Sequence, residues 1–196
     1  MDVDHLTFAQ AWEWSARLWQ LLLIVWLLLW FGMKRAKKRE AWTERLQHTV
    51  LVLLGFWLLF GGLRHWAWLN DQFLASAARV WLVGLILTAA GIGISIWARL
   101  SLGSNWSGTV TLKKDHQLVR QGLYHWIRHP IYTGILLAML GTAVILGEVR
   151  GLVGLALVLI AFYFKARREE CFLRQEFGAD FEDHASHTGM FLPKLL

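Results

Sequence analysis

Apolar residues come in long blocks along this chain, without the alternation of a strand or the stripe of an amphipathic helix. Five blocks can be marked, at about residues 16–33, 49–68, 79–99, 130–147 and 151–167. Each is close to the ~20 residues that a helix needs to cross the hydrocarbon core of a bilayer. The pattern predicts an all-α, polytopic integral membrane protein with about five transmembrane helices.

The last two blocks are short, and a polar turn separates them. In this turn, residues 147–151, glycines flank a charged pair, which is typical of a chain reversal at a membrane surface. His129 and Glu169 lie 40 positions apart, which is about two spans of roughly 20 residues each. We therefore expect a C-terminal helical hairpin that returns Arg128 and His129 to the level of Glu169 and Glu170.

The composition supports this class of protein and excludes others. The chain is 56% hydrophobic and carries 13 Trp and only 2 Pro, which is a membrane composition. Its formal charge of +6 does not indicate a nucleic-acid partner, because Lys and Arg cluster between the apolar blocks. A single cysteine excludes an internal disulfide, and although His125 and His129 have the spacing of a metal pair, no third ligand accompanies them. We expect no metal.

The basic residues predict the orientation of the spans, because cytoplasmic loops of membrane proteins are enriched in Lys and Arg. Of the 20 basic residues, 16 fall on one side, and only Arg17, Arg64, Arg79 and Arg150 fall on the other. The N-terminus is therefore expected outside and the C-terminus in the cytoplasm. The two long polar segments, residues 100–129 and 168 onward, lie on the cytoplasmic side. We therefore divide the chain into a three-span scaffold, residues 1–99, and a half that carries the chemistry, residues 100–196.

The most informative segment runs from His116 to Gly134 and holds three His, two Arg and two Tyr beside the fourth block. Each residue has an ordinary structural explanation; Pro130, for example, suits the first turn of a helix. Their joint occurrence is harder to explain in this way, because Arg and His at membrane depth are costly unless they face a cavity, a partner or a ligand. With the Glu169–Glu170 pair they predict a mixed-charge pocket at the cytoplasmic end of two adjacent helices.

These motifs resemble a known family. The Gly-x-Tyr element at Gly122, the Arg-His-Pro-x-Tyr-x-Gly element at Arg128, the Glu-Glu pair and then Phe177-Gly178 occur in the order seen in isoprenylcysteine carboxyl methyltransferases. Phospholipid N-methyltransferases share two of these elements. The resemblance covers about residues 103–193, and residues 103–107 resemble bacterial members in particular, which would place the protein in a bacterial inner membrane.

The resemblance implies S-adenosyl-L-methionine as cofactor and a set of residues that contact it. A carboxylate suits the methionine ammonium, a His or Arg suits its carboxylate, and an aromatic face suits the sulfonium cation. The implied cofactor-binding residues are His116, Leu118, Val119, Tyr124, His129, Pro130, Ile131, Tyr132 and Glu170.

The resemblance also implies an Arg on the fifth helix, just before the Glu pair, that holds a substrate carboxylate. Arg167 is our choice for this role, and Lys165 and Arg168 are the alternatives. Arg128 is the second candidate catalytic residue. The expected acceptor is hydrophobic or lipid-like, such as an isoprenylcysteine, and would reach the site from the membrane while the cofactor arrives from the cytoplasm.

Other functions stay open at this point. A carboxylate acceptor is ionised at neutral pH, whereas an amine, with a pKa of about 10, needs a base such as Glu169 or His129. A phospholipid N-methyltransferase is therefore an alternative. Sterol reductases of membranes resemble the same half and use NADPH, so a reductase is a further alternative, and a non-catalytic membrane scaffold is the last.

Overall fold

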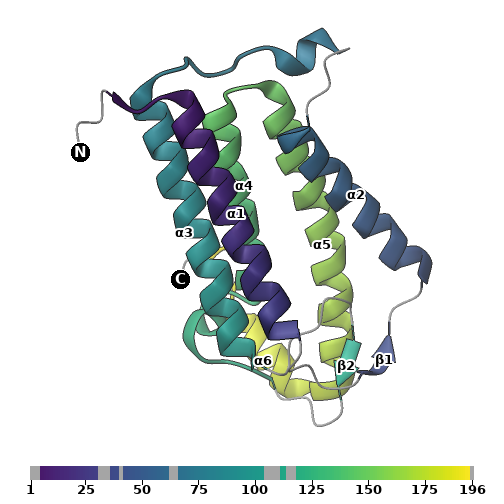
Figure 1. Cartoon of the computed structure of the whole chain (residues 1–196). Helices are drawn as coiled ribbons and strands as arrows, with labels where there is room; N and C mark the ends of the chain where they lie inside the picture. Colours follow the sequence, from purple (N-terminus) through teal and green to yellow (C-terminus); the bar gives the residue numbers. More distant parts are fainter. Residues whose placement is uncertain are drawn as a thin grey trace.

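A computed structural model describes residues 5–30, 36–39, 42–61, 66–103, 111–113 and 118–194. Its long elements are five helices that alternate in direction along one bundle (Figure 1): α1 (Phe8–Trp30), α2 (Trp42–Phe60), α3 (Ala78–Leu102), α4 (Pro130–Leu146) and α5 (Val149–Phe177). A short helix, α6 (Ala179–His187), lies at the end of the bundle where α5 ends. Two 3-10 turns, η2 (Ala67–Asn70) and η4 (Gly122–His125), precede α3 and α4.

The prediction of an all-helical architecture is confirmed for these long elements, with one addition. Strands β1 (Ala36–Arg39) and β2 (Thr111–Lys113) pair antiparallel, which the block pattern did not predict. Among the described helices, α3 and α5 have the length and the apolar composition to cross a membrane, and α4 is apolar but has 17 residues. The number of five spans therefore stays a prediction.

The helix ends differ from the ends of the apolar blocks. α5 continues to Phe177, well beyond residue 167, because helical hydrogen bonding does not require apolar side chains and polar residues can extend it. At its other end the turn is tighter than expected: Gly147 ends α4 in the left-handed conformation, with φ of 69°, and α5 begins at Val149. Pro130 occupies the first turn of α4, as predicted.

Small residues bring α3 and α4 into backbone contact. A Cβ atom on Gly91 would lie 2.3 Å from the amide nitrogen of Ala138 and 2.4 Å from the carbonyl oxygen of Gly134. Apolar association of helices in lipid relies on such close packing and on interhelical hydrogen bonds. The buried Thr142 hydroxyl of α4 takes part in such an interhelical hydrogen bond, which it accepts from Trp19 of α1 at 3.0 Å. These contacts make α1, α3 and α4 a closely packed unit.

α2 contacts α5 at a pair of glycines and then separates from it. A Cβ on Gly55 would lie 2.7 Å from the carbonyl oxygen of Gly154, so the two backbones touch there. Toward the end of the bundle that holds α6 the two helices diverge (Figure 1), and a groove of about 900 Å³ opens between them. We call it the α2–α5 groove; its lining includes Leu46, His48, Leu51, Phe164, Arg167 and Arg168.

Candidate active site

The hairpin of α4 and α5 brings the start of one helix against the last turns of the other. Arg128 and His129 directly precede α4, and Glu169 and Glu170 lie on α5. The Arg128 side chain donates from Nε to Glu170 Oε1 at 2.7 Å, and His129 Nε2 lies 3.3 Å from the same oxygen. The proximity predicted from the spacing of 40 positions is therefore confirmed.

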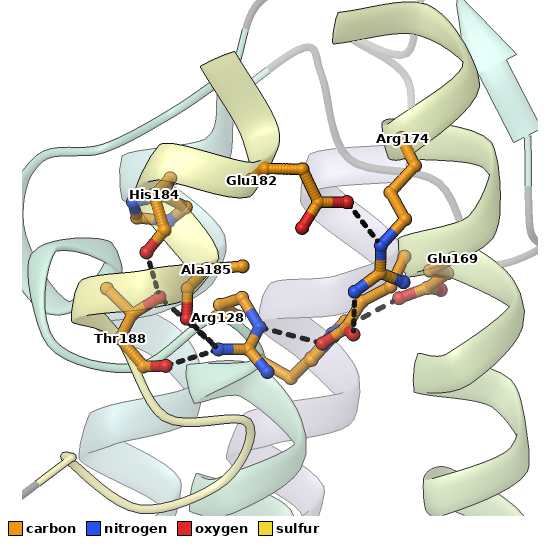
Figure 2. Close-up of polar contacts among 9 residues, drawn as sticks. Arg128, Glu169, Arg174, Glu182, His184, Ala185 and Thr188 are labelled. Atoms are coloured by element: carbon orange, nitrogen blue, oxygen red, sulfur yellow. Dashed lines mark hydrogen bonds and ion pairs between the residues drawn. The ribbon is translucent and has the colours of Figure 1, made fainter. Parts of the chain in front are cut away.

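Glu170 is a buried carboxylate surrounded by cations. Its side chain is 1% exposed, and besides Arg128 and His129 it contacts Arg174 one turn later on α5, with Nη2 to Oε2 at 3.6 Å. Arg174 also reaches Glu182 of α6, at 2.8 Å (Figure 2). Because an isolated buried carboxylate is costly, these partners stabilise its ionised form and fix its orientation.

His129 lies between both carboxylates. Its Nδ1 is 3.4 Å from Glu169 Oε2, while its Nε2 faces Glu170. Burial by itself lowers the pKa of His129, but hydrogen bonds and charge attraction from the two glutamates outweigh burial and hold this pKa above its ordinary value. The imidazolium form, which donates from both nitrogens, is therefore favoured at this position.

Tyr132 connects the polar cluster to an aromatic wall. Its hydroxyl donates to Glu169 Oε1 at 2.6 Å, and its ring stacks on the rings of His129 and Phe162, with centroids 5.4 and 4.6 Å away. The ammonium of Lys165 lies 5.3 Å from the centroid of the same ring. A tyrosine ring that accepts a cation in this way is a favourable neighbour for a positive charge.

An apolar cluster lies next to these polar groups. Tyr124 and Ile131 are buried and pack with Ala98 of α3, and Val119 and Tyr132 pack against them. Of the other residues implied by the resemblance, Pro130 is fully buried at the start of α4 and Leu118, beside Val119 in the sequence, is half-buried. His116 lies outside the described residues, so its role stays a prediction.

The three basic residues before the Glu pair point to different sides of α5. Lys165 is 8% exposed and lies on the side of Tyr132. Arg167 is exposed and lines the α2–α5 groove, and Arg168, which lines it too, donates to His48 Nδ1 of α2 at 3.2 Å. The structure thus brings Lys165 to the His129–Glu170 cluster and leaves Arg167 in the groove.

Arg128 has further partners on the protein itself. Its Nη1 donates to the carbonyl oxygens of Ala185, at 3.3 Å, and Thr188, at the end of α6 (Figure 2). The last carbonyls of a helix lack intrahelical donors, so a guanidinium stabilises them. Burial, and then the positive charges of Arg120 and Arg128, lower the pKa of the neighbouring His184 below its ordinary value, so that imidazole stays neutral.

A family model described as phospholipid methyltransferase matches residues 80–180, which is more than half of the 196 residues. The matched range includes α4, α5 and the cluster of Arg128, His129, Tyr132, Glu169 and Glu170. The chain belongs to the phospholipid methyltransferase family. Family membership agrees with the motifs, because the match contains both the Arg128–Gly134 segment and the Glu pair.

Curated relatives of this chain carry the name that the motifs predicted, and this confirms the resemblance. A probable protein-S-isoprenylcysteine O-methyltransferase of Oryza sativa subsp. indica is 34% identical over 113 residues, 55% of this chain and 59% of the relative. A protein-S-isoprenylcysteine O-methyltransferase of Tribolium castaneum is 32% identical over 139 residues, 68% of this chain and 45% of the relative. The chain thus spans about half the length of the curated relatives it matches.

A solved structure is also similar: the eukaryotic intramembrane Ras methyltransferase, isoprenylcysteine carboxyl methyltransferase, with 27% sequence identity and a TM-score of 0.49. The similarity covers 80% of this chain and 54% of that chain.

Sequence reasoning missed several residues that the structure brings to the cluster. Phe162 stacks on the ring of Tyr132, and the ring of Phe191 contacts the ring of His129. Thr133, which follows Tyr132 in the sequence, donates a hydrogen bond to the Phe191 carbonyl. The signal for Thr133 was its place inside the Arg-His-Pro-x-Tyr-x-Gly element. Phe191 had no signal, because an isolated aromatic near the end of a chain has no pattern that assigns it a partner.

Proposed function

We propose that this protein is an integral membrane methyltransferase that uses S-adenosyl-L-methionine to methylate a carboxylate on a hydrophobic, isoprenylcysteine-like or lipid-like acceptor at the cytoplasmic face of the membrane. The observation that carries the proposal is the joining of Glu169 and Glu170 to His129 and Tyr132 across the α4–α5 hairpin. In this proposal residues 1–99 hold the scaffold and residues 100–196 carry the chemistry.

The chemistry of the described residues fits this cofactor. Glu170 offers a buried carboxylate to the methionine ammonium, and the Tyr132 ring, which already neighbours the Lys165 ammonium, suits the sulfonium. The apolar cluster of Tyr124 and Ile131 offers a wall to the adenine ring. His129, held as an imidazolium, and Arg128 favour the methionine carboxylate. We propose that the cofactor-binding residues are those implied by the motifs. The set therefore also includes Leu118, Val119, Pro130 and, outside the described part of the chain, His116.

When bound, S-adenosyl-L-methionine would supply an electrophilic methyl group to the acceptor oxygen. The residues of this chain have to hold the acceptor, align its oxygen and exclude water, and positioning of this kind contributes much of the rate. A carboxylate, with a reference pKa of about 4, is already ionised and needs a cation to hold it instead of a base. We propose Arg167 for that cation and Lys165 as the alternative.

The α2–α5 groove supports Arg167. Leu46, Leu51 and Phe164 line it with apolar side chains, and Arg167 and Arg168 add two guanidinium groups beside the carboxylate of Glu44. Such a groove suits a molecule with an apolar chain and an acidic head, because the chain leaves water and the head meets a guanidinium. Lys165 has the better position relative to Tyr132, so a substitution at each of these two residues is needed to separate them.

A phospholipid N-methyltransferase is the second candidate, favoured by the description of the matching family. An amine acceptor must lose a proton before it can accept the methyl group, and Glu169 is the carboxylate best placed to receive that proton. The product distinguishes the two candidates, because a methyl ester is cleaved by mild base and an N-methylated head group is not.

The experiment that tests the proposal combines binding with product analysis. Calorimetric titration of the purified protein in detergent should give binding of S-adenosyl-L-methionine and none of NADPH. Mass spectrometry of native membranes, with and without the protein, should then find a lipid or lipidated species heavier by one CH₂ unit. Binding of NADPH alone would replace the proposal by the reductase, and binding of neither by the scaffold.

The orientation is tested separately. We propose five spans with the N-terminus outside, because basic residues gather on the side of the His129–Glu170 cluster. A reporter enzyme fused after Leu196 should be active in the cytoplasm of a bacterial host. Activity of that reporter on the outer side of the inner membrane would overturn the placement of the whole site.

A further inference from the structure

The segment that follows α6 returns to the start of α4. We call residues Thr188–Leu192 the C-terminal strap. The carbonyl oxygen of Gly189 accepts from the Arg128 amide at 2.9 Å, and that of Met190 accepts from the His129 amide at 3.1 Å. In the other direction, the Gly189 amide donates to the Trp126 carbonyl at 3.2 Å. The strap therefore runs beside the backbone that carries Arg128 and His129.

This pairing orders the backbone that leads into α4. The first amides of a helix have no intrahelical acceptor, and His129, in the N-cap position, makes no side-chain cap. The strap carbonyls accept instead from the two amides just before the helix, those of Arg128 and His129. They also fix the backbone dihedrals of His129, and with them the direction in which its ring leaves the chain.

One side chain on α4 fastens the strap. The Thr133 hydroxyl lies 2.7 Å from the carbonyl oxygen of Phe191 and 3.2 Å from that of His129, one turn earlier. Its bond to Phe191 holds that residue so that its ring contacts the His129 ring, with centroids 6.2 Å apart and planes at 61°. Arg128 fastens the beginning of the strap, through the Thr188 carbonyl (Figure 2).

We propose that Thr133 is a positioning residue: by holding Phe191 it keeps the C-terminal strap on His129, and so fixes the imidazole between Glu169 and Glu170 for cofactor binding. The inference rests on the proposed use of S-adenosyl-L-methionine. Thr133 does not touch the reacting groups in this scheme; it acts through the strap and through His129.

Three variants of the full-length protein in detergent test it. Thr133→Val removes the hydroxyl with little change in shape, and Thr133→Ser keeps it. Thr49→Val is the matched control, because Thr49 is exposed on α2 and its hydroxyl donates within its own helix, to the Arg45 carbonyl at 2.8 Å. Two properties are measured: hydrogen exchange of the peptide that contains the strap, and the affinity for S-adenosyl-L-methionine by calorimetry.

We expect Thr133→Val to speed exchange in the strap and to weaken cofactor binding about fivefold, the effect of one lost hydrogen bond transmitted to the site. Thr133→Ser should stay within twofold of the wild type on both measures, and so should Thr49→Val. Faster exchange in Thr133→Val with unchanged affinity would overturn the inference and leave the proposed function intact. Unchanged exchange would also overturn it. A wild-type protein that binds no S-adenosyl-L-methionine would overturn both, and is seen before any variant is made.

Discussion

Glu170 is the residue whose charge the site depends on most, so its replacement by Gln is the sharpest test. Gln has nearly the same shape but no charge, so the variant keeps the packing of α5 and removes the ion pairs. Arg128, whose side chain is 13% exposed, and the buried His129 would then face a neutral amide. Losing one partner of a buried ion pair typically costs about 3–5 kcal/mol, because the other charge is left uncompensated.

The expected magnitude is at the low end of that range. Arg174 is 39% exposed, so water compensates most of its loss and we assign nothing to it. The Arg128 contact then dominates, and we expect the free energy of unfolding to fall by about 3 kcal/mol. For a chain of this size that corresponds to a fall in Tm of about 6–12 °C. A lost charge-assisted contact to the cofactor ammonium should in addition weaken S-adenosyl-L-methionine binding about tenfold or more.

Both quantities can be measured on the purified protein in detergent. The 13 tryptophans report thermal unfolding by intrinsic fluorescence, and calorimetry reports the affinity. Glu176→Gln is the matched control, because it makes the same change on the same helix at an exposed position. A fall in Tm of less than about 2 °C, together with unchanged affinity, would show that Glu170 is not the centre of a buried ion-pair cluster and would refute the reasoning.

Three further predictions concern the neighbouring residues. Arg167→Ala should raise the acceptor KM at least about tenfold and leave cofactor affinity within a few-fold, whereas that result in Lys165→Ala would reassign the anchor. Because the pKa of His129 is raised, its charge attraction to the two glutamates is complete below about pH 6.5 and is lost as pH rises through the raised pKa. The Tm of the wild type should therefore fall over that pH range, and the Tm of His129→Gln should fall less. Gly91→Ala should prevent folding or lower stability by about 3 kcal/mol or more, since its Cβ overlaps backbone atoms of α4. Gly93→Ala is the control: its Cβ meets no atom of another element within 4 Å, so it should unfold like the wild type in the same fluorescence assay.

The parts of the site that could be predicted from the sequence are those fixed by spacing along two helices. A span has a set length, so a separation of 40 positions places His129 and Glu169 at one level whatever the details of packing. The start of α4 at Pro130 follows from the chemistry of proline in the same way. Neither inference needs knowledge of which face of a helix meets which neighbour.

The choice among the basic residues of α5 does need that knowledge. Lys165 and Arg167 are two positions apart, so their side chains leave the helix about 200° from each other, toward different neighbours. Only the packing of α5 between α4 and α2 decides that Lys165 meets Tyr132 and that Arg167 lines the groove. An apolar block cannot supply this, because it reports membrane depth and not rotation about the helix axis.

The C-terminal strap escaped prediction for another reason. Gly189 and Met190 contact the start of α4 through backbone carbonyls, which every residue carries, so no residue type marks the contact in the sequence. The pairing of β1 with β2 is similar, because it joins the polar segments after α1 and after α3 through backbone hydrogen bonds. Contacts of this kind become visible only when both segments are seen in space.

The glycine contact between α2 and α5 has a mechanical consequence for the width of the groove. Gly55 and Gly154 bring the two backbones together, and the Arg168–His48 hydrogen bond joins the same helices again within the groove. About 16 Å of helix separate Gly55 from Glu44, which lines the groove, at ~1.5 Å per residue. Rotation of α2 by about 10° around the glycine contact would move Glu44 by about 3 Å. Such a tilt would widen the groove only if the Arg168–His48 bond opened, so this one hydrogen bond sets the width of the groove while α4 and α5 stay in place.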